Sequence, residues 1–339
     1  MSAQITAPRT TGHRGGRIRA SGLVVLLLAL GILIRLLVPG ESPWFPATAR
    51  DFVTLALAVF IESLPFVVLG TLIAIAVRIW VPDGVIERAL PKRPWLRRVA
   101  LSLFGIVLPV CECGNVPLAR GLIQRGFAPA EAVTFLLAAP ILNPVTILTT
   151  AQAFGWNSEI LLVRVLGGFV IANLLGWWLS GHPSPERMLT PGFRSACAHH
   201  AVAPRGGRLR RSADEFLTET AQLMPALALG AALAGAIQVG VPRSALLALG
   251  ADPLWSVLAL IVLAFVVSLC ATVDAFFILS VSAAFLPGSV TAFLLFGAMM
   301  DVKMVALMRT TFTGRTVAQL AVLTALCVAA IGWGMNLVA

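Results

Sequence analysis

Long runs of apolar side chains alternate with short basic segments along the chain. Runs of roughly the length that a bilayer core requires, about 17–25 residues, lie at 22–38, 52–77, 160–180, 215–239 and 317–338. We expect each of them to form a membrane-crossing helix. A basic arm at 1–21 precedes the first run, and no small-residue cleavage motif follows it. We therefore predict an uncleaved first helix within 22–50, with the N-terminus in the cytoplasm.

Composition and charge support a membrane protein. The chain is 58% hydrophobic and 12% charged, whereas soluble proteins carry about 25% charged residues. The net charge of +10 is concentrated between the apolar runs, notably at 78–98 and 181–214. This distribution is typical of cytoplasmic loops in a cytoplasmic (inner) membrane protein. It does not indicate nucleic-acid binding, because no binding motif or interleaved aromatic side chain accompanies it.

Two stretches of the chain resemble each other weakly at a nearly constant spacing. IESLPFVVLGTLIA begins at 61 and AQLMPALALGAALA begins 160 positions later. The matched pairs are Pro65 with Pro225, Gly70 with Gly230, Cys111 with Cys270, Asn115 with Asp274, and Asn143 with Asp301. We predict two homologous permease repeats, one at 51–180 and one at 215–339, joined by a basic cytoplasmic linker at 181–214.

The two basic segments determine the expected topology. If 78–98 and 181–214 are both cytoplasmic, one of the three apolar stretches between them must return to its own side. We assign this role to 99–125, which proline and glycine interrupt. Its counterpart at about 255–285 would then enter from outside, so that the second half is inverted. We expect the loop 120–128 to face the cytoplasm, and the loops 155–159 and 241–254 to face the outside of the cell.

The predicted fold is an all-α polytopic membrane protein with about 7–9 membrane segments, built from an N-terminal helix and two inverted halves with broken or re-entrant helices. The alternative is that every apolar stretch crosses the membrane. It would give about nine helices in parallel repeats and place one arginine-rich loop outside.

The interrupted stretch 99–125 contains VCECGNVP at 110–117. Its candidate binding residues are Cys111, Glu112, Cys113, Gly114 and Asn115. Side chains two positions apart do not share a helix face. We therefore expect an unwound, cavity-lining turn in which both sulfurs converge on a soft ion or on trivalent arsenic. The alternative is that the cysteines are inert packing residues.

Further polar residues lie in the other apolar stretches. The additional candidates are Asn143, Cys270, Asp274, Asp301 and Lys303 for substrate binding, Cys270 with Cys111 and Cys113 as metal ligands, and Glu62 with Glu112 for proton coupling. Charges inside a membrane mark pathways or ion pairs. We expect Lys303 to pair with Glu112, Asp274 or Glu62. A regular helix would place Asp301 about 200° away from Lys303. A purely structural ion pair between the halves is the alternative.

Several classes of protein are excluded by missing motifs. The chain has no P-loop and no H-E-x-x-H, so we expect no ATPase on this chain and no intramembrane zinc protease. Its cysteines do not form a disulfide framework. We predict no enzymatic activity and no cofactor. The expected partners are the lipid bilayer and a small-molecule or ion substrate, with homo-oligomer formation left open.

The segments CECGNVPLARGLIQRG, AAPILNPVTI, SLCATVDAFF and MMDVKM together resemble the predicted-permease family that includes the ArsP-type organoarsenical efflux permeases. The resemblance covers about 51–338. It implies a cytoplasmic-membrane permease, trivalent organoarsenicals as substrates, and contacts from Cys111 and Cys113 to arsenic. A third thiol at Cys270 would suit arsenite or a metal ion equally well. We predict a secondary transporter that exports a small thiophilic substrate. The alternatives are a metal-handling or assembly factor that holds a soft metal without moving it, and an intramembrane enzyme.

Overall fold

Helices make up the regular structure of the chain. The computed structural model describes residues 47–338, apart from 83, 86, 87, 89, 109, 201–206, 241–251 and 253. The longer helices are α2 (Ala47–Ile75), α4 (Pro94–Leu103), α5 (Glu112–Gln124), α6 (Pro129–Leu142), α7 (Pro144–Phe154), α8 (Glu159–Ser180), α9 (Pro191–His200), α10 (Arg208–Gly240), α12 (Trp255–Val267), α13 (Asp274–Leu279), α14 (Pro287–Met299), α15 (Val302–Met308) and α16 (Gly314–Val338). Short turns are η1 (Ala76–Trp80), η2 (Phe104–Ile106), η3 (Pro185–Met188) and η4 (Ser282–Ala284). The predicted basic arm, the predicted first helix at 22–38 and nearly all of the segment 241–254 lie outside the described residues.

Several helices are long and apolar enough to cross a membrane. Within the described part of the chain there are five such spans: Ala47–Trp80, Glu159–Ser180, Arg208–Gly240, Pro287–Met308 and Gly314–Val338. The pair α6 and α7, bent by 40°, would make a sixth. The predicted all-α polytopic membrane protein is therefore confirmed.

The two stretches predicted to be interrupted do not form continuous helices. In the first, α4 ends at Leu103 and α5 begins only at Glu112. In the second, α12 ends at Val267, the next residue Ser268 is left-handed with a φ of 51°, and α13 begins at Asp274. Each stretch is thus a pair of short helices joined by irregular backbone. Such backbone is tolerated at membrane depth only where protein or a cavity surrounds it.

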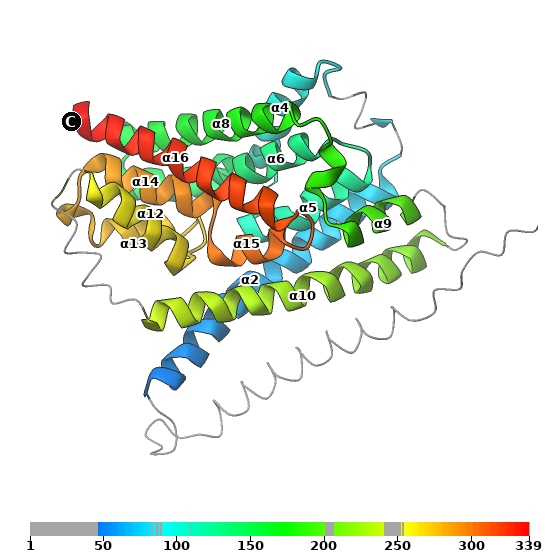
Figure 1. Ribbon diagram of the computed structural model, residues 1–339, viewed down its shortest axis with the longest axis horizontal. Coiled ribbons are helices and arrows are strands. Elements are labelled where there is room, and N and C mark those ends of the chain that lie inside the picture. Colours follow the sequence, from blue (N-terminus) through cyan, green and yellow to red (C-terminus); the bar gives the residue numbers. More distant parts are fainter. Residues whose placement is uncertain are drawn as a thin grey trace, which may run out of the picture.

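The helices form layers around the centre of the molecule (Figure 1). Helices α2 and α10 pack side by side and run in opposite directions. On the opposite side α8 packs on α6, and α16 packs on α14. Helices α5 and α15 lie between these layers, in contact with each other. Every residue of α6 is buried, so this helix and α14 form much of the core.

Two glycines bring the outer pair α2 and α10 close to the central helices. A Cβ atom at Gly70 of α2 would lie 2.1 Å from the carbonyl oxygen of Gly114 on α5. A Cβ atom at Gly230 of α10 would lie 2.9 Å from the Cα of Lys303 on α15. The backbones therefore touch at these points, and only glycine permits this approach. Gly70 and Gly230 are the residues that the proposed repeat pairs. The repeat itself remains a prediction.

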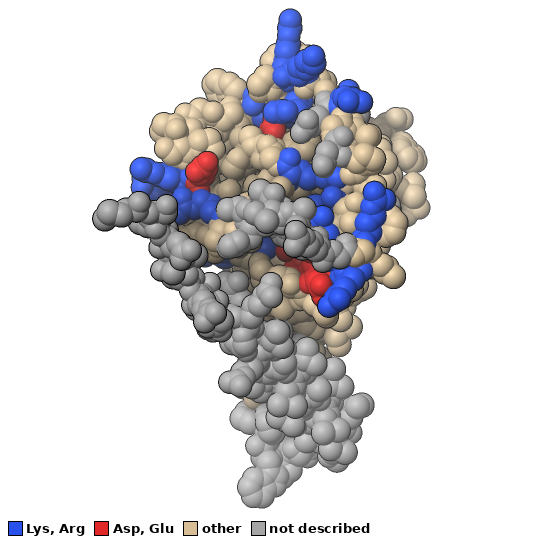
Figure 2. Space-filling view, turned by 90° about the vertical axis from the view of Figure 1, so that its right-hand side faces the viewer, with Lys and Arg blue, Asp and Glu red and all other residues tan. Residues whose placement is uncertain are grey.

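Basic side chains gather at one end of the molecule. Figure 2 shows Lys and Arg concentrated on the face where α9 and the start of α10 lie. Among the described residues of 181–214, the exposed arginines are Arg187, Arg194, Arg208 and Arg210. The basic linker predicted at 181–214 contains helical structure, because its described residues include α9 and the first turns of α10. The predicted loop 120–128 is likewise helical as far as Gln124, and Arg120 is buried.

The basic end is expected to face the cytoplasm. Helix α8 has 22 residues, about 33 Å at 1.5 Å per residue, so its two ends should lie on opposite sides of the bilayer. With Cys197 and Cys327 replaced by serine, an impermeant maleimide should label Trp156→Cys in whole cells. It should label Arg210→Cys only after the cells are opened. Labelling of Arg210→Cys in intact cells would contradict this topology.

Candidate functional site

The N-terminal end of α5 carries the cysteine motif. Cys111 is the N-cap, with extended backbone, and the helix begins at Glu112. The backbone N–H groups of Gly114 and Asn115 donate to the Cys111 carbonyl at 3.1 and 3.2 Å. Cys113, Gly114 and Asn115 are therefore helical, and the expected unwound turn is wrong for them. The chain is extended only as far as Cys111. A carboxylate in the first helical turn also suits the helix dipole.

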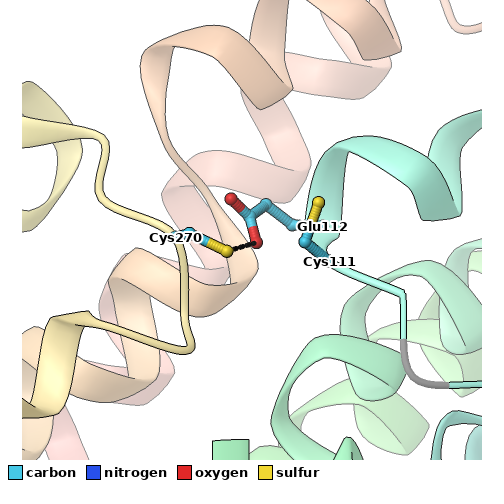
Figure 3. A group of neighbouring side chains, drawn as sticks. All are labelled: Cys111, Glu112 and Cys270. Carbon is cyan, nitrogen blue, oxygen red and sulfur yellow. Dashed lines mark hydrogen bonds between the residues drawn. The ribbon is translucent and has the colours of Figure 1, made fainter. Parts of the chain in front are cut away.

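Three donor atoms from two distant segments meet at this helix end (Figure 3). The Sγ atoms of Cys111 and Cys270 and a carboxylate oxygen of Glu112 lie within 4.8 Å of one another. The Cys270 thiol points at Glu112 and donates to its Oε2 at 3.7 Å. Cys111, Glu112 and Cys270 are 5%, 1% and 3% exposed. Cys113 is also buried but does not belong to this group. The geometry thus brings together one cysteine from each of the two interrupted stretches.

Lys303 neutralises the Glu112 carboxylate. Its Nζ lies 3.0 Å from Glu112 Oε1 and 3.5 Å from Asp301 Oδ2. Of the three partners predicted for Lys303, which were Glu112, Asp274 and Glu62, the structure shows Glu112. The expected separation of Asp301 from Lys303 is wrong. Asp301 is the N-cap of α15 in extended backbone, where its Oδ1 accepts from the Met304 N–H at 2.6 Å, so regular helical spacing does not apply.

The three buried charges do not balance. When Glu112, Asp301 and Lys303 are all ionised, they leave one excess negative charge, and each is at most 1% exposed. Charge–charge interactions are strong at such a buried position, because little water is present to screen them. In this fully ionised state, the excess negative charge would favour a cationic group beside the two thiols.

Two asparagines predicted to bind substrate differ in their surroundings. The Asn143 side chain accepts from the Val145 N–H at 2.9 Å and donates to the Val110 carbonyl at 3.3 Å. It thus joins the α6–α7 break to the segment before Cys111. Asn115 is fully buried, and neither atom of its amide has a hydrogen-bond partner among the described residues. It lies three positions after Glu112 within α5, so the two side chains are neighbours on the same side of the helix.

Two other predicted residues contribute no donor atom to the cluster. Asp274 is the first residue of α13 and forms a two-pronged ion pair with Arg164, at 2.6 and 3.0 Å. It is therefore not the partner of Lys303. Glu62 lies on an exposed face of α2. The described structure does not bring it to the cysteines.

Comparison with known proteins places the chain in a family. The family profile described as predicted permease, ArsP_1, matches residues 48–337. The chain belongs to this family. The UPF0718 protein YcgR of Bacillus subtilis is 34% identical over 264 residues, covering 77% of this chain and 88% of the relative. No solved structure matches significantly.

A further relative also bears a permease name. The putative two-component membrane permease complex subunit of Streptococcus mutans is 29% identical over 278 residues, covering 81% of this chain and 91% of the relative. Together with the spans described above, these relationships make the chain a multi-pass membrane permease. Membership of this family indicates a transporter rather than an enzyme.

Two arginines of the permease are buried although the sequence did not lead us to expect it. Arg164 lies in α8 and Arg120 in α5, and each is 1% exposed. Arg120 donates to Glu219, to Gln222 at 2.7 Å and to the Thr310 and Thr311 hydroxyls at 3.0 and 3.1 Å. An arginine within an apolar run is itself a signal of buried pairing. Arg164, in the run 160–180, carried that signal.

Proposed function

We propose that the permease exports a small thiophilic substrate, a trivalent organoarsenical or a soft metal ion, across the cytoplasmic membrane. The observation that carries this proposal is the cluster of Cys111, Glu112 and Cys270, whose donor atoms lie within 4.8 Å of one another in the buried centre of the molecule. Thiolates select soft ions. Two thiols suit a monosubstituted trivalent arsenical, and the carboxylate adds a third donor for a metal ion.

The position of the cluster supports transport. Its donors come from the two interrupted stretches, one in each predicted half, and broken helices near the membrane centre are where secondary transporters bind substrate. Helices α2 and α10 run antiparallel (Figure 1), as inverted halves require. We propose that the halves are inverted repeats, that the cluster lies between them, and that movement of one half against the other exposes it to each side.

Transport in everted membrane vesicles tests this function. Vesicles should accumulate phenylarsine oxide, arsenite or one of a panel of soft metal ions. Cys111→Ser or Cys270→Ser should reduce uptake by at least about tenfold, because even outer-shell changes at metal sites cost 10–100-fold. Cys113→Ser should reduce it less, since Cys113 lies outside the donor group.

Matched controls are available in the same chain. Cys197 of α9 and Cys327 of α16 are both half-buried free cysteines outside the donor group. Cys197→Ser and Cys327→Ser should transport at the parental rate. Parental transport by the double Cys111→Ser, Cys270→Ser variant would refute the proposed site.

A second function is favoured by the burial of the cluster. All three donors are at most 5% exposed, as a factor that holds a soft metal without moving it would require. The vesicle experiment separates the two functions. A holding factor would bind the ion stoichiometrically when purified but would not produce accumulation in vesicles.

A further inference from the structure

Arg164 holds the irregular segment that carries Cys270. Its guanidinium donates to the Ala271 carbonyl at 3.3 Å and to both carboxylate oxygens of Asp274 at 2.6 and 3.0 Å. It also donates to the Thr150 hydroxyl of α7 at 2.8 Å. Arg164 thus joins α7 and α8 to the residue directly after Cys270 and to the first residue of α13.

The segment between α12 and α13 has a second anchor at its other end. The Gln238 side chain of α10 donates to the Val267 carbonyl, the last residue of α12, at 2.9 Å. Between the two anchors the chain turns through left-handed Ser268. The backbone N–H groups of Val273 and Asp274 donate back to the Cys270 carbonyl at 3.0 and 3.1 Å. Cys270 therefore lies at the start of a tight turn. Arg164 contacts this turn at the Ala271 carbonyl and at the Asp274 carboxylate.

We propose that Arg164 is the positioning residue for the Cys270 thiol. This inference rests on the proposed function, in which Cys270 is a substrate ligand. Loss of the bonds to the Ala271 carbonyl and to Asp274 removes the side-chain contacts by which Arg164 of α8 holds this turn in place. The Cys270 sulfur then leaves its place beside Cys111 and Glu112.

The arrangement requires arginine rather than a generic cation. One planar guanidinium reaches two carboxylate oxygens, a carbonyl and a hydroxyl at once, whereas an ammonium is a compact point charge with fewer donors. Arg164→Lys should therefore keep the charge opposite Asp274 but release the carbonyl of Ala271. The double variant Arg164→Met, Asp274→Leu removes the ion pair completely. Apolar replacement of a buried pair commonly preserves folding.

Cadmium binding to the purified, full-length permease in detergent tests the proposal. The readout is thiolate-to-cadmium charge-transfer absorption per bound cadmium ion, measured with the affinity and the thermal unfolding temperature. In the parental protein two thiolates should contribute, and Cys270→Ser should reduce the absorption to about half. Arg164→Lys and the double variant Arg164→Met, Asp274→Leu should fall to the Cys270→Ser level. The matched control Arg120→Met, Glu219→Leu removes a different buried pair and should retain the parental absorption.

The results distinguish the positioning role of Arg164 from the proposed role of Cys270 as a substrate ligand. Full absorption in folded Arg164→Lys, or in the folded double variant, overturns the positioning role and leaves the cadmium site intact. Parental absorption that Cys270→Ser does not change removes Cys270 from the site and overturns both proposals. A decrease in the Arg120→Met, Glu219→Leu control equal to that of the Arg164 variants would show general loosening of the fold, which also contradicts a specific role for Arg164.

Discussion

Replacing Lys303 by methionine is expected to remove most of the folded permease from the membrane. Glu112 and Asp301 would then face each other as uncompensated buried carboxylates, because Lys303 Nζ is within ion-pair distance of both. Breaking a buried ion pair by deleting one partner costs about 3–5 kcal/mol. This is a large share of the roughly 5–15 kcal/mol that stabilises a typical domain.

Neutralising a carboxylate should partly reverse this loss. Lys303→Met combined with Glu112→Gln leaves one buried carboxylate instead of two, so the amount and unfolding temperature of the detergent-extracted protein should rise. Fluorescence-detected size-exclusion chromatography measures both. Arg309→Met is the control, since Arg309 is an exposed basic residue just after α15, and it should match the parental protein. Failure of both Glu112→Gln and Asp301→Asn to rescue Lys303→Met would refute the pairing.

Arg120→Met is expected to have the second largest effect on stability. Arg120 joins four parts of the permease: α5, α10 through Glu219, the turn at 310–311, and α9 through Phe193, whose ring lies 4.6 Å from the guanidinium. Loss of the arginine leaves Glu219 buried without its main partner. The expected cost is again about 3–5 kcal/mol.

Thermal unfolding in detergent measures this effect through tryptophan fluorescence. Arg120→Met should unfold at a clearly lower temperature. Addition of Glu219→Leu should recover most of the difference, because an apolar pair replaces the ion pair. Arg210→Met, on the exposed start of α10, should unfold with the parental protein. If Arg120→Met unfolds with it too, the arginine network contributes nothing to stability.

The fold class could be predicted from the sequence, and so could the pairing of Lys303 with a distant carboxylate. Arginine-rich segments and apolar lengths indicated the spans, and two interrupted stretches indicated where irregular backbone lies. A lone lysine in an apolar stretch predicted a buried partner because isolated charges are costly in lipid. Lys303 and Glu112 are that pair.

Local backbone limited what the sequence could predict about the site. The segment before α5 lacks the Ser, Thr, Asp or Asn that usually marks an N-cap, so the helix start at Glu112 was not evident and Cys113 was wrongly assigned to an unwound turn. Asp301 was treated as helical, although it caps α15 from outside. Arg120 was placed in a cytoplasmic loop with Arg125 because arginines between apolar runs are expected on that side. Each error concerns a helix boundary, where one residue changes which way a side chain points.

The ion pair between Glu112 and Lys303 also has a consequence for biosynthesis. The two residues are 191 positions apart (303 − 112), so at about 5–20 residues per second the ribosome needs roughly 10–40 s to deliver the lysine after the carboxylate. During that interval the nascent first half enters the bilayer with an acidic residue whose counter-ion does not yet exist. The nascent chain must meanwhile accommodate Glu112 without this partner. A chain released after α8 would carry two of the central thiols but neither Cys270 nor Lys303, so the binding site forms only late in translation.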